Sequence, residues 1–290
     1  MTARIAILSW NIQYGLGVDG QVDLDRIAAT CLALGDADIL CLQEVSVGFG
    51  ELAPAAAADQ VAALASRFPG HEPVFVPAID RPGAGGRRRF GNMILSRLPV
   101  LDVVAHALPR PADATVIHMQ RHALEATVAV GDRALRVVTT HLEYHSRAQR
   151  LAQAQRLAAL GAEWDARAAA PAPAGKGPYA ALPPVDGTVL CGDFNFPLDE
   201  PAYAAVTASE AGFVDAWPAL HGAAPHAPTC GVHDRQQWPQ GAHARDFFFV
   251  SAPLAARLDA LAVDTQTAAS DHQPLLLTLS AGASAGAAAR

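Results

Sequence analysis

Residues 188–195 read Thr188-Val189-Leu190-Cys191-Gly192-Asp193-Phe194-Asn195, an apolar run that meets a glycine and then two polar side chains. Side chains two residues apart in a strand lie on the same face, so we expect Asp193 and Asn195 to point together from the end of a buried strand. Gly192 has no Cβ and allows another backbone or a ligand to come close. The junction suits a site where an anion or a hard metal meets a positioned water. Asp, Asn and Gly are also ordinary turn residues, so the stretch gains meaning only beside similar strand ends elsewhere in the chain.

The composition indicates a globular protein with a substantial core, since 51% of the 290 residues are hydrophobic and 17% are charged. A chain of this length can bury one large core or two modest ones. We predict one domain over residues 1–280 and a disordered tail rich in Ala, Gly and Ser over residues 281–290.

The start of the chain bears on its compartment. Met1-Thr2-Ala3-Arg4 enters a strand-like run at once and leaves no room for a signal peptide, and no apolar run is long enough to cross a bilayer. We therefore expect a cytoplasmic protein without stable membrane association, acting as a monomer. The cysteines form no CxxC pair, and Cys31, Cys41 and Cys191 are expected to be small core residues rather than disulfide partners.

The formal net charge of −7 limits the possible partners. Proteins that grip duplex DNA through its phosphates usually carry a basic face. The one basic cluster is Arg87-Arg88-Arg89, in a Gly-rich segment over 81–89 that we predict to be a mobile surface loop. Extended nucleic acid is therefore disfavoured, although these arginines could also clamp a phosphate.

Hydrophobic periodicity predicts many strands and few helices. A buried strand over 4–12 precedes a helix that begins after Asp23 and ends at Gly35, and an apolar strand follows over 37–45. Roughly ten strands in a chain of this length favour two packed sheets with helices on their outer faces. Further strands are predicted at 73–77, 90–97, 100–105, 124–130, 135–140, 188–195, 246–251, 258–263 and 274–279, with helices over 59–68, after Ser146 and over 200–211, and an inserted loop over 168–184.

Polar side chains close or open nearly all of these apolar runs, which places them along the rim of the sheets. Each one alone is ordinary, because a lone Asn after a strand is usually a cap or turn residue. The set consists of Asn11, Glu44, Asn92, His141, Asp193, Asn195, Asp246, Asp271 and His272.

Together these residues resemble, in chain order, the motif set of the endonuclease/exonuclease/phosphatase superfamily. The resemblance spans about Ile5 to Leu279, and six ordered motifs are far more specific than any one of them. It implies the DNase I-like α/β fold, a four-layer sandwich of two packed mixed β-sheets flanked by helices. The motifs are Ser9-Trp10-Asn11-Ile12, Gln43-Glu44, Gly91-Asn92-Met93-Ile94-Leu95-Ser96-Arg97, Thr140-His141-Leu142, Gly192-Asp193-Phe194-Asn195 and Ser270-Asp271-His272.

One motif departs from the family pattern. Many members carry Arg-Ile-Asp before an aromatic residue, whereas this chain reads Ala244-Arg245-Asp246-Phe247. The arginine sits one residue nearer to the acid and would project to the opposite side of a strand. Asp246 carries over, but Arg245 does not inherit a role.

Hydrolysis of a phosphate ester requires charge neutralisation, an activated water and help for the leaving group. Glu44 is the expected inner-shell ligand of a hard cation, with Asn11 and Asp271 as further oxygen donors. Carboxylate, amide and water ligands suit Mg²⁺ or Mn²⁺ and not zinc.

The resemblance also implies the remaining roles. Asp193 would position or deprotonate the attacking water, and Asn195 would hold the phosphoryl group. Asp246 would orient His272, the usual role of a carboxylate behind a histidine. His141 and His272 would donate to phosphoryl oxygens or act as acid and base, Asn92 would tie the site together, and Arg121 and His226 are further candidates for substrate contact.

Three alternatives remain open on the sequence. The segment with His221, His226, Cys230, His233 and His243 could hold zinc, although its spacings fit no tight metal motif. The fold could also serve a binding module without catalysis, because a fold does not fix function. The protein could be a general DNA endonuclease or exonuclease. We expect instead a metal-dependent phosphodiesterase that favours a small or single-stranded substrate.

Overall fold

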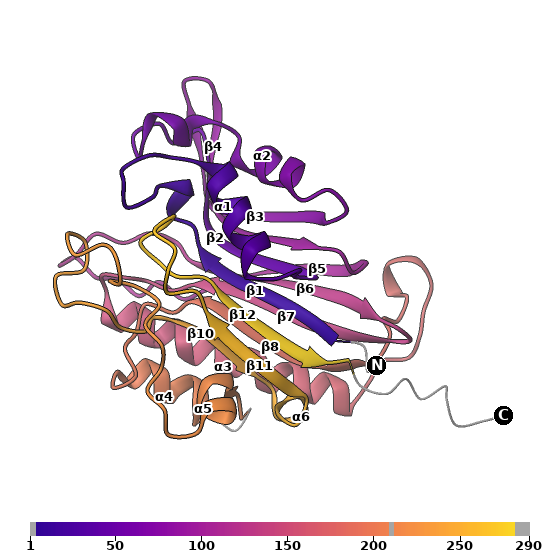
Figure 1. The fold of residues 1–290 in the computed structure, drawn as a ribbon. Coiled ribbons are helices and arrows are strands. Elements are labelled where there is room, and N and C mark those ends of the chain that lie inside the picture. The colour runs from indigo at the N-terminus through magenta and orange to yellow at the C-terminus, as the bar shows by residue number, and fades with distance from the viewer. Residues whose placement is uncertain (1–3, 209–211, 282–290) are drawn as a thin grey trace.

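Two six-stranded mixed sheets pack face to face, as Figure 1 shows for the computed structural model, which describes residues 4–208 and 212–281. The first sheet has the strand order β11-β12-β1-β2-β4-β3 and the second the order β5-β6-β7-β8-β10-β9. Each sheet contains one parallel pair, β1 with β2 and β7 with β8. The strands are β1 Arg4–Asn11, β2 Ile39–Val47, β3 Glu72–Gly83, β4 Gly86–Ser96, β5 Val100–Ala107, β6 His122–Val130, β7 Arg133–His141, β8 Val185–Asp193, β9 Val214–Asp215, β10 Asp246–Val250, β11 Leu258–Val263 and β12 Leu275–Ser280.

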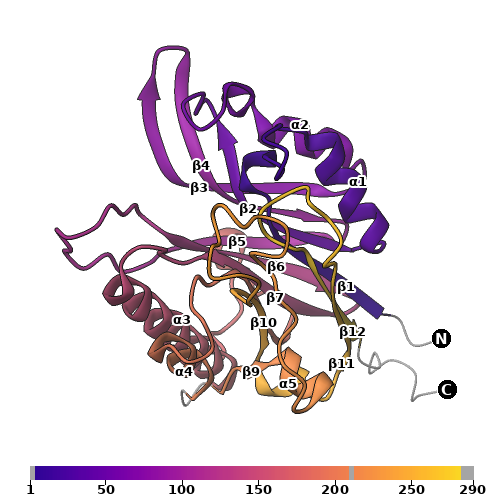
Figure 2. The same ribbon diagram turned by 60° about the vertical axis from the view of Figure 1, so that its left-hand side comes forward.

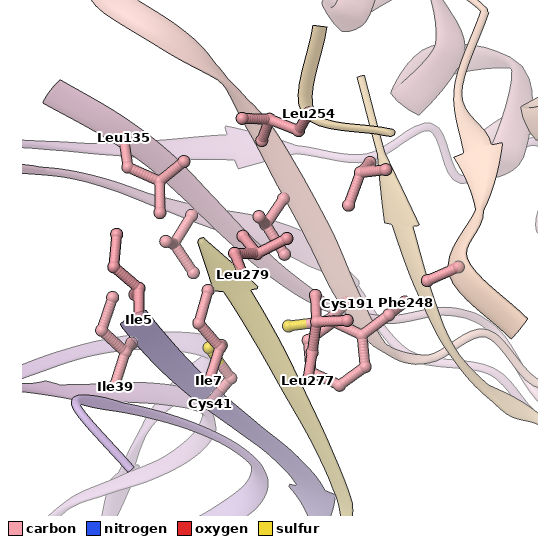
Figure 3. Close-up of a cluster of buried hydrophobic side chains, with 14 of the residues drawn as sticks. Ile5, Ile7, Ile39, Cys41, Leu135, Cys191, Phe248, Leu254, Leu277 and Leu279 are labelled. Carbon is pink, nitrogen blue, oxygen red and sulfur yellow. The ribbon is translucent and has the colours of Figure 1, made fainter. Parts of the chain in front are cut away.

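The main core lies between the sheets (Figure 3) and contains side chains from both of them. Ile7 and Leu277 come from the first sheet and Val137 and Phe248 from the second, and each is at most 1% exposed. Full burial of one such apolar side chain contributes about 1.5–3 kcal/mol, so this interface contributes substantially to the stability of the fold. Cys41 and Cys191 lie in the same core as free thiols.

Helices cover the two outer faces and complete four layers (Figure 2). Helix α1 begins after Asp23, which accepts hydrogen bonds from the backbone N–H groups of Asp25 and Arg26, and it ends at Gly35. Side chains of α1 and α2 pack on the first sheet, and those of α3 and α4 pack on the second. The helices are α1 Leu24–Leu34, α2 Gln60–Arg67, α3 Arg147–Ala169, α4 Pro201–Thr207, α5 Ala216–His221 and α6 Ala252–Ala255, with 3-10 turns at Gln13–Gly15, Pro54–Ala57 and Gly177–Tyr179.

The predicted mobile loop over 81–89 is wrong. This segment continues the strands of the long β3–β4 hairpin, whose register pairs Arg81 with Arg88 and Gly83 with Gly86. Intramolecular contacts hold two of its arginines: Arg87 Nε donates to Asp80 Oδ1 at 2.6 Å, and the Arg88 guanidinium lies 5.1 Å from the ring centroid of Phe49 and pairs with Glu51. Strand pairing across the hairpin therefore overrides the Gly-rich local signal.

Smaller differences concern short elements. Helix α4 ends at Thr207, before the predicted residue 211, and residues 209–211 fall outside the described range. The short elements β9, α5 and α6 were not predicted, because two to six residues are too few to show a period. The predicted tail falls outside the described residues except for Ala281. In the part of the chain that the structure describes, no helix has both the length and the apolar character needed to span a membrane.

Candidate active site

The site is built where the parallel strand pairs of both sheets end. Strand β1 ends at Asn11, and β7 and β8 end side by side at His141 and Asp193, which are register partners. Gly192 permits this close pairing: its φ is +132°, and a Cβ there would lie 2.0 Å from the carbonyl oxygen of Thr140. The glycine of the 188–195 stretch is therefore required by the approach of the neighbouring backbone, as predicted.

Glu44 reaches the site through an irregularity in β2. The pairing of β2 with β4 shifts register between Leu42 and Val45, and Glu44 has a φ of 62°. A non-glycine residue in this left-handed region costs about 1–3 kcal/mol and is typical of functional sites. As a result Gln43 is fully buried, whereas Glu44 lines the active-site cavity.

The carboxylates crowd one another. Burial, then the nearby charge of Asp271, raises the pKa of Glu44 to about 7. Burial also raises the pKa of Asp271. A bound cation would offset the cost of the negative charge on the half-buried Glu44 and the buried Asp271, and carboxylate oxygens are the ligands that Mg²⁺ and Mn²⁺ prefer. The donor set therefore fits a divalent metal at Glu44 and Asp271.

Asn11 connects the two carboxylates of the site. Its side-chain Nδ2 donates to Glu44 Oε1 at 3.1 Å and to Asp193 Oδ2 at 3.0 Å, while its Oδ1 accepts from the backbone N–H of Gln13 at 3.1 Å. Nδ2 is the end of the amide that meets the acids. Asn11 therefore positions the two carboxylates, and the prediction that its oxygen helps to hold a metal stays a prediction.

Asp193 lies between two histidines. Its Oδ2 is 3.4 Å from His141 Nε2 and 3.7 Å from His272 Nε2, and its Oδ1 accepts from the backbone N–H of Asn195 at 2.9 Å. Burial raises its pKa, but His272, His141 and the hydrogen bonds of Asn11 and Asn195 outweigh burial and lower it overall. Asp193 is therefore a carboxylate at neutral pH.

The two histidines have opposite proton affinities. Burial, and then the charge of Arg121, lowers the pKa of His141 to about 3, so His141 is neutral. Burial opposes protonation of His272, but Asp246, Asp271 and Asp193 outweigh it and raise its pKa well above the usual range. His272 Nδ1 lies 2.8 Å from Asp246 Oδ2, and both side chains are buried. The site thus holds one neutral imidazole and one imidazolium.

Among the described residues, one group of metal-ligating side chains has its ligand atoms within 4.8 Å of one another, namely Asp193, Asp246 and His272. His272 Nδ1 is already hydrogen-bonded to Asp246, so side chains of this group satisfy one another without a metal. It borders a half-open cavity of about 290 Å³. The cavity is lined by Gln13, Glu44, Arg121, His141, Tyr144, Asp193, Asn195, Gln237, Trp238, Asp271 and His272.

A family model of the endonuclease/exonuclease/phosphatase family matches residues 8–272. The chain belongs to this family. Family members are hydrolases that act on phosphoester bonds, and the family is divalent-metal dependent. The match covers all six motifs of the sequence and confirms both the predicted family and the predicted fold.

Solved structures agree with the fold of the family. An endonuclease/exonuclease/phosphatase from Beutenbergia cavernae DSM 12333 has 24% identity and a TM-score of 0.68, covering 96% of this chain and 71% of its own. D. rerio TDP2 complexed with single strand DNA product has 21% identity and a TM-score of 0.64, covering 95% and 98%. The human nocturnin catalytic domain with bound sulfate anion has 21% identity and a TM-score of 0.60, covering 95% and 92%. No curated protein matches the chain.

Arg121 lines the cavity, and its contact with substrate stays a prediction. Its Nε lies 3.3 Å from Glu143 Oε2, while its Nη1 is buried without a hydrogen-bond partner. A buried guanidinium nitrogen that lacks an acceptor is suited to an anion. Asn92 lies behind it: its Nδ2 meets the carbonyl of His122 at 3.5 Å, and it lines a small second cavity that shares Arg121 and His141 with the first.

The remaining site predictions have different outcomes. The Asn195 side chain lines the cavity, and its Nδ2 donates to the carbonyl of Leu142 at 3.0 Å. His226 is not among the described residues that line the cavity. It pairs with Asp215 at 3.1 Å and stacks on Trp217 at a centroid distance of 5.5 Å. His226 is therefore a structural residue of another surface.

The alternative zinc site is not assembled. His221 Nε2 meets the carbonyl of Leu261 at 3.0 Å, and His233 Nε2 meets that of Thr265 at 2.9 Å. Cys230 Sγ lies 3.3 Å from His243 Nε2, but neither belongs to the one metal-ligating group in the described chain. Two histidines of this segment instead form hydrogen bonds with the backbone of the segment over 261–265.

The same loop supplies residues that the sequence did not point to. Trp238 Nε1 donates to Asp271 Oδ2 at 3.1 Å, and the Trp238 and His272 rings meet edge-on at 5.6 Å. Arg245 Nη1 donates to the carbonyl of Asn195 at 2.5 Å, and its guanidinium lies 5.2 Å from the Trp238 ring. Arg245, to which the sequence assigned no role, therefore supports the wall of the site. A lone Trp in a polar loop carries no period or motif, so no sequence signal could have found it.

Proposed function

We propose that the protein is a divalent-metal-dependent phosphodiesterase that hydrolyses a small or single-stranded phosphodiester by attack of an activated water. The observation that carries this proposal is the position of Asp193, a buried carboxylate with Oδ2 between His141 Nε2 at 3.4 Å and His272 Nε2 at 3.7 Å. We also propose that residues 1–280 form one catalytic domain and that the protein acts in the cytoplasm, where its four free cysteines stay reduced.

Asp193 holds the attacking water in this mechanism. Asn11 and the backbone N–H of Asn195 fix its two oxygens, so the carboxylate accepts a hydrogen bond from water at a defined position. His272, protonated and held by Asp246, donates to a phosphoryl oxygen as negative charge develops there. The unpartnered Nη1 of Arg121 supplies a further positive donor in the same cavity.

Glu44 and Asp271 would hold Mg²⁺ or Mn²⁺, with Asn11 fixing Glu44 from behind. Such an ion, when bound, neutralises charge on the phosphoryl oxygens and on the leaving oxygen. Trp238 keeps the Asp271 carboxylate oriented by its hydrogen bond.

Three observations favour a short or single-stranded substrate over duplex DNA. The net charge is −7, and Arg87 and Arg88 of the β3–β4 hairpin are engaged by acids and a ring of the same chain. TDP2 in its complex with a single strand DNA product shares the fold at a TM-score of 0.64. General nuclease activity on duplex is the second candidate, because the cavity is open on one side and the β3–β4 hairpin projects beyond the sheets (Figure 2).

Purified protein should hydrolyse bis-p-nitrophenyl phosphate with Mg²⁺ or Mn²⁺ and lose this activity in EDTA. Asp193→Ala should lower turnover by about 10²–10⁴-fold, the range for loss of a group that positions and deprotonates water. Asp259→Asn, in an exposed ion pair on β11, is the matched control and should leave turnover unchanged. Undiminished turnover after rigorous chelation would exclude the metal mechanism. Rapid degradation of plasmid at physiological salt would make the protein a general nuclease.

A further inference from the structure

Tyr144 is an exposed aromatic ring at the edge of a polar site. It is 41% exposed and lines the 290 Å³ cavity together with Glu44, Asp193 and Asp271. Of the large hydrophobic side chains exposed in residues 4–208 and 212–281, Tyr144 is the one that lines this cavity. A single exposed tyrosine is ordinary on a protein surface. The support beneath this one distinguishes it.

The turn that carries Tyr144 is fixed from the inside of the protein. Arg150 Nη1 donates to the carbonyl oxygens of Glu143 at 2.7 Å and Tyr144 at 2.8 Å. The same guanidinium makes two hydrogen bonds to Glu200, at 2.8 and 2.9 Å, so it cannot swing away. Gln153 Oε1 accepts from the backbone N–H of Glu143 at 2.8 Å. The backbone of Tyr144 is therefore set before any ligand arrives.

The ring itself is held by its neighbours. Trp238 meets it at 5.9 Å with an interplanar angle of 85°, and His145 meets it at 4.8 Å and 86°. The Arg245 guanidinium lies over the ring, 5.8 Å from its centroid. Edge-on ring contacts at these distances are stabilising. Together these contacts restrain the tilt of the ring, which remains 41% exposed and lines the cavity.

We infer that Tyr144 is a stacking platform for a planar unsaturated ring joined to the scissile phosphate, such as a nucleobase or an aryl ester group. The inference rests on the proposed phosphodiesterase function and names its substrate class. A side chain that is already rigid loses little conformational entropy when a ligand binds. More of the contact free energy of a preorganised ring therefore appears as affinity. The cavity is of the size that accepts a small molecule, and Tyr144 lines it together with the charged groups of the site.

The expected effect is measurable. Stacking of a base on a protein ring contributes about 5- to 150-fold in affinity per base, from its free energy of about 1–3 kcal/mol. Head-group esters of phospholipids carry no planar ring and cannot use this contact. The inference therefore ranks nucleotide and aryl diesters above them.

The test compares substrates that differ only in the ring. Dithymidylate is paired with the same dinucleotide in which one base is replaced by hydrogen, and benzyl methyl phosphate with cyclohexylmethyl methyl phosphate. The first pair tests a nucleobase and the second an aryl group. The variants are Tyr144→Leu, which removes the ring, and Tyr144→Phe, which keeps it. Tyr179→Leu is the control, since Tyr179 is 81% exposed and does not line the cavity.

Wild type, Tyr144→Phe and Tyr179→Leu should prefer the ring-bearing partner in kcat/KM by about 5- to 150-fold, and Tyr144→Leu should lose most of that preference. Equal preference in Tyr144→Leu and wild type, with melting temperatures unchanged, would overturn the inference. Equilibrium binding of thymidine monophosphate against deoxyribose 5-phosphate, followed by tryptophan fluorescence, needs no turnover. Ring-dependent binding that Tyr144→Leu abolishes, in a protein that hydrolyses no diester, would refute the proposed function and leave the inference standing. Binding without ring preference would refute the inference alone.

Discussion

His272 Nδ1 and Asp246 Oδ2 lie 2.8 Å apart, and neither side chain is more than 4% exposed. The two residues come from different segments, since Asp246 opens β10 and His272 lies in the loop before β12. Asp246 raises the pKa of His272, although burial opposes this, and burial raises the pKa of Asp246 itself to about 6. At neutral pH the proton of this buried pair therefore lies on His272, whose Nε2 is 3.7 Å from Asp193 Oδ2.

Asp246→Asn should therefore impair turnover nearly as much as His272→Ala. The double variant should be little worse than either single variant, because residues that act as one unit give strongly non-additive losses. Turnover on bis-p-nitrophenyl phosphate at saturating metal measures both effects. Losses that multiply in the double variant would show that Asp246 acts independently of His272.

Glu44 couples metal binding to pH. Its pKa is raised to about 7, first by burial and second by Asp271, and a metal binds the deprotonated carboxylate. Affinity for Mg²⁺ should rise about tenfold per pH unit below pH 7, because one proton leaves Glu44, and should level off above it. Titration of Mg²⁺ by calorimetry between pH 5.5 and 8.5 checks the slope.

The raised pKa of Glu44 also predicts that the stability of the metal-free protein falls as pH rises, whereas the affinity for Mg²⁺ rises. A carboxyl group whose folded pKa lies above its unfolded value stabilises the fold below the unfolded value, near pH 4, and loses that contribution as pH rises through about 7. In EDTA, Glu44→Gln should thus raise the melting temperature more at pH 8 than at pH 5, because only part of the contribution has been lost by pH 5. Saturating Mg²⁺ should remove the advantage at pH 8. An identical effect of Glu44→Gln at both pH values would contradict the raised pKa.

The sequence predicted those parts of the site that depend on strand ends. His141 and Asp193 close apolar runs, and parallel pairing of the two strands brings them side by side. Asp246 was also predicted, because its acid and the following aromatic residue keep the motif of the family. Periodicity and motif order are local signals, and these positions depend on little else.

The rest depends on tertiary structure. The register shift that turns Glu44 into the cavity arises from pairing with β4, which no local pattern encodes. The β3–β4 hairpin looked like a loop because glycines and arginines dominate its tip, although cross-strand pairing holds it. Tyr144, Trp238 and Arg245 meet through contacts between a turn, a long loop and the start of a strand. The sequence spacing of side chains brought together in this way does not indicate that they are in contact.

Gly192→Ala should destabilise the fold by about 3 kcal/mol or more, as expected for a clash at a strained backbone position. The added Cβ would lie 2.0 Å from the Thr140 carbonyl oxygen, which is backbone and cannot move aside without breaking the pairing of β7 and β8. Gly131→Ala is the control, with φ of +63° and open space around the Cβ, and should cost about 1–2 kcal/mol. Chemical denaturation measures both. Equal costs would show that backbone conformation, and not the close approach, accounts for Gly192.

Arg150 joins α3, α4 and the turn that carries Tyr144 through one buried guanidinium. Arg150→Met should cost about 3–5 kcal/mol, since it strands the buried Glu200 carboxylate and two carbonyl oxygens. Arg4→Met, which breaks an exposed pair with Asp259 at 2.9 Å, should cost about 0–1 kcal/mol. Adding Glu200→Gln to Arg150→Met should recover part of the loss, because the uncompensated charge disappears. Urea unfolding of the three variants checks the ranking. A double variant no more stable than Arg150→Met would mean that the lost carbonyl contacts, rather than the stranded Glu200 charge, account for the cost.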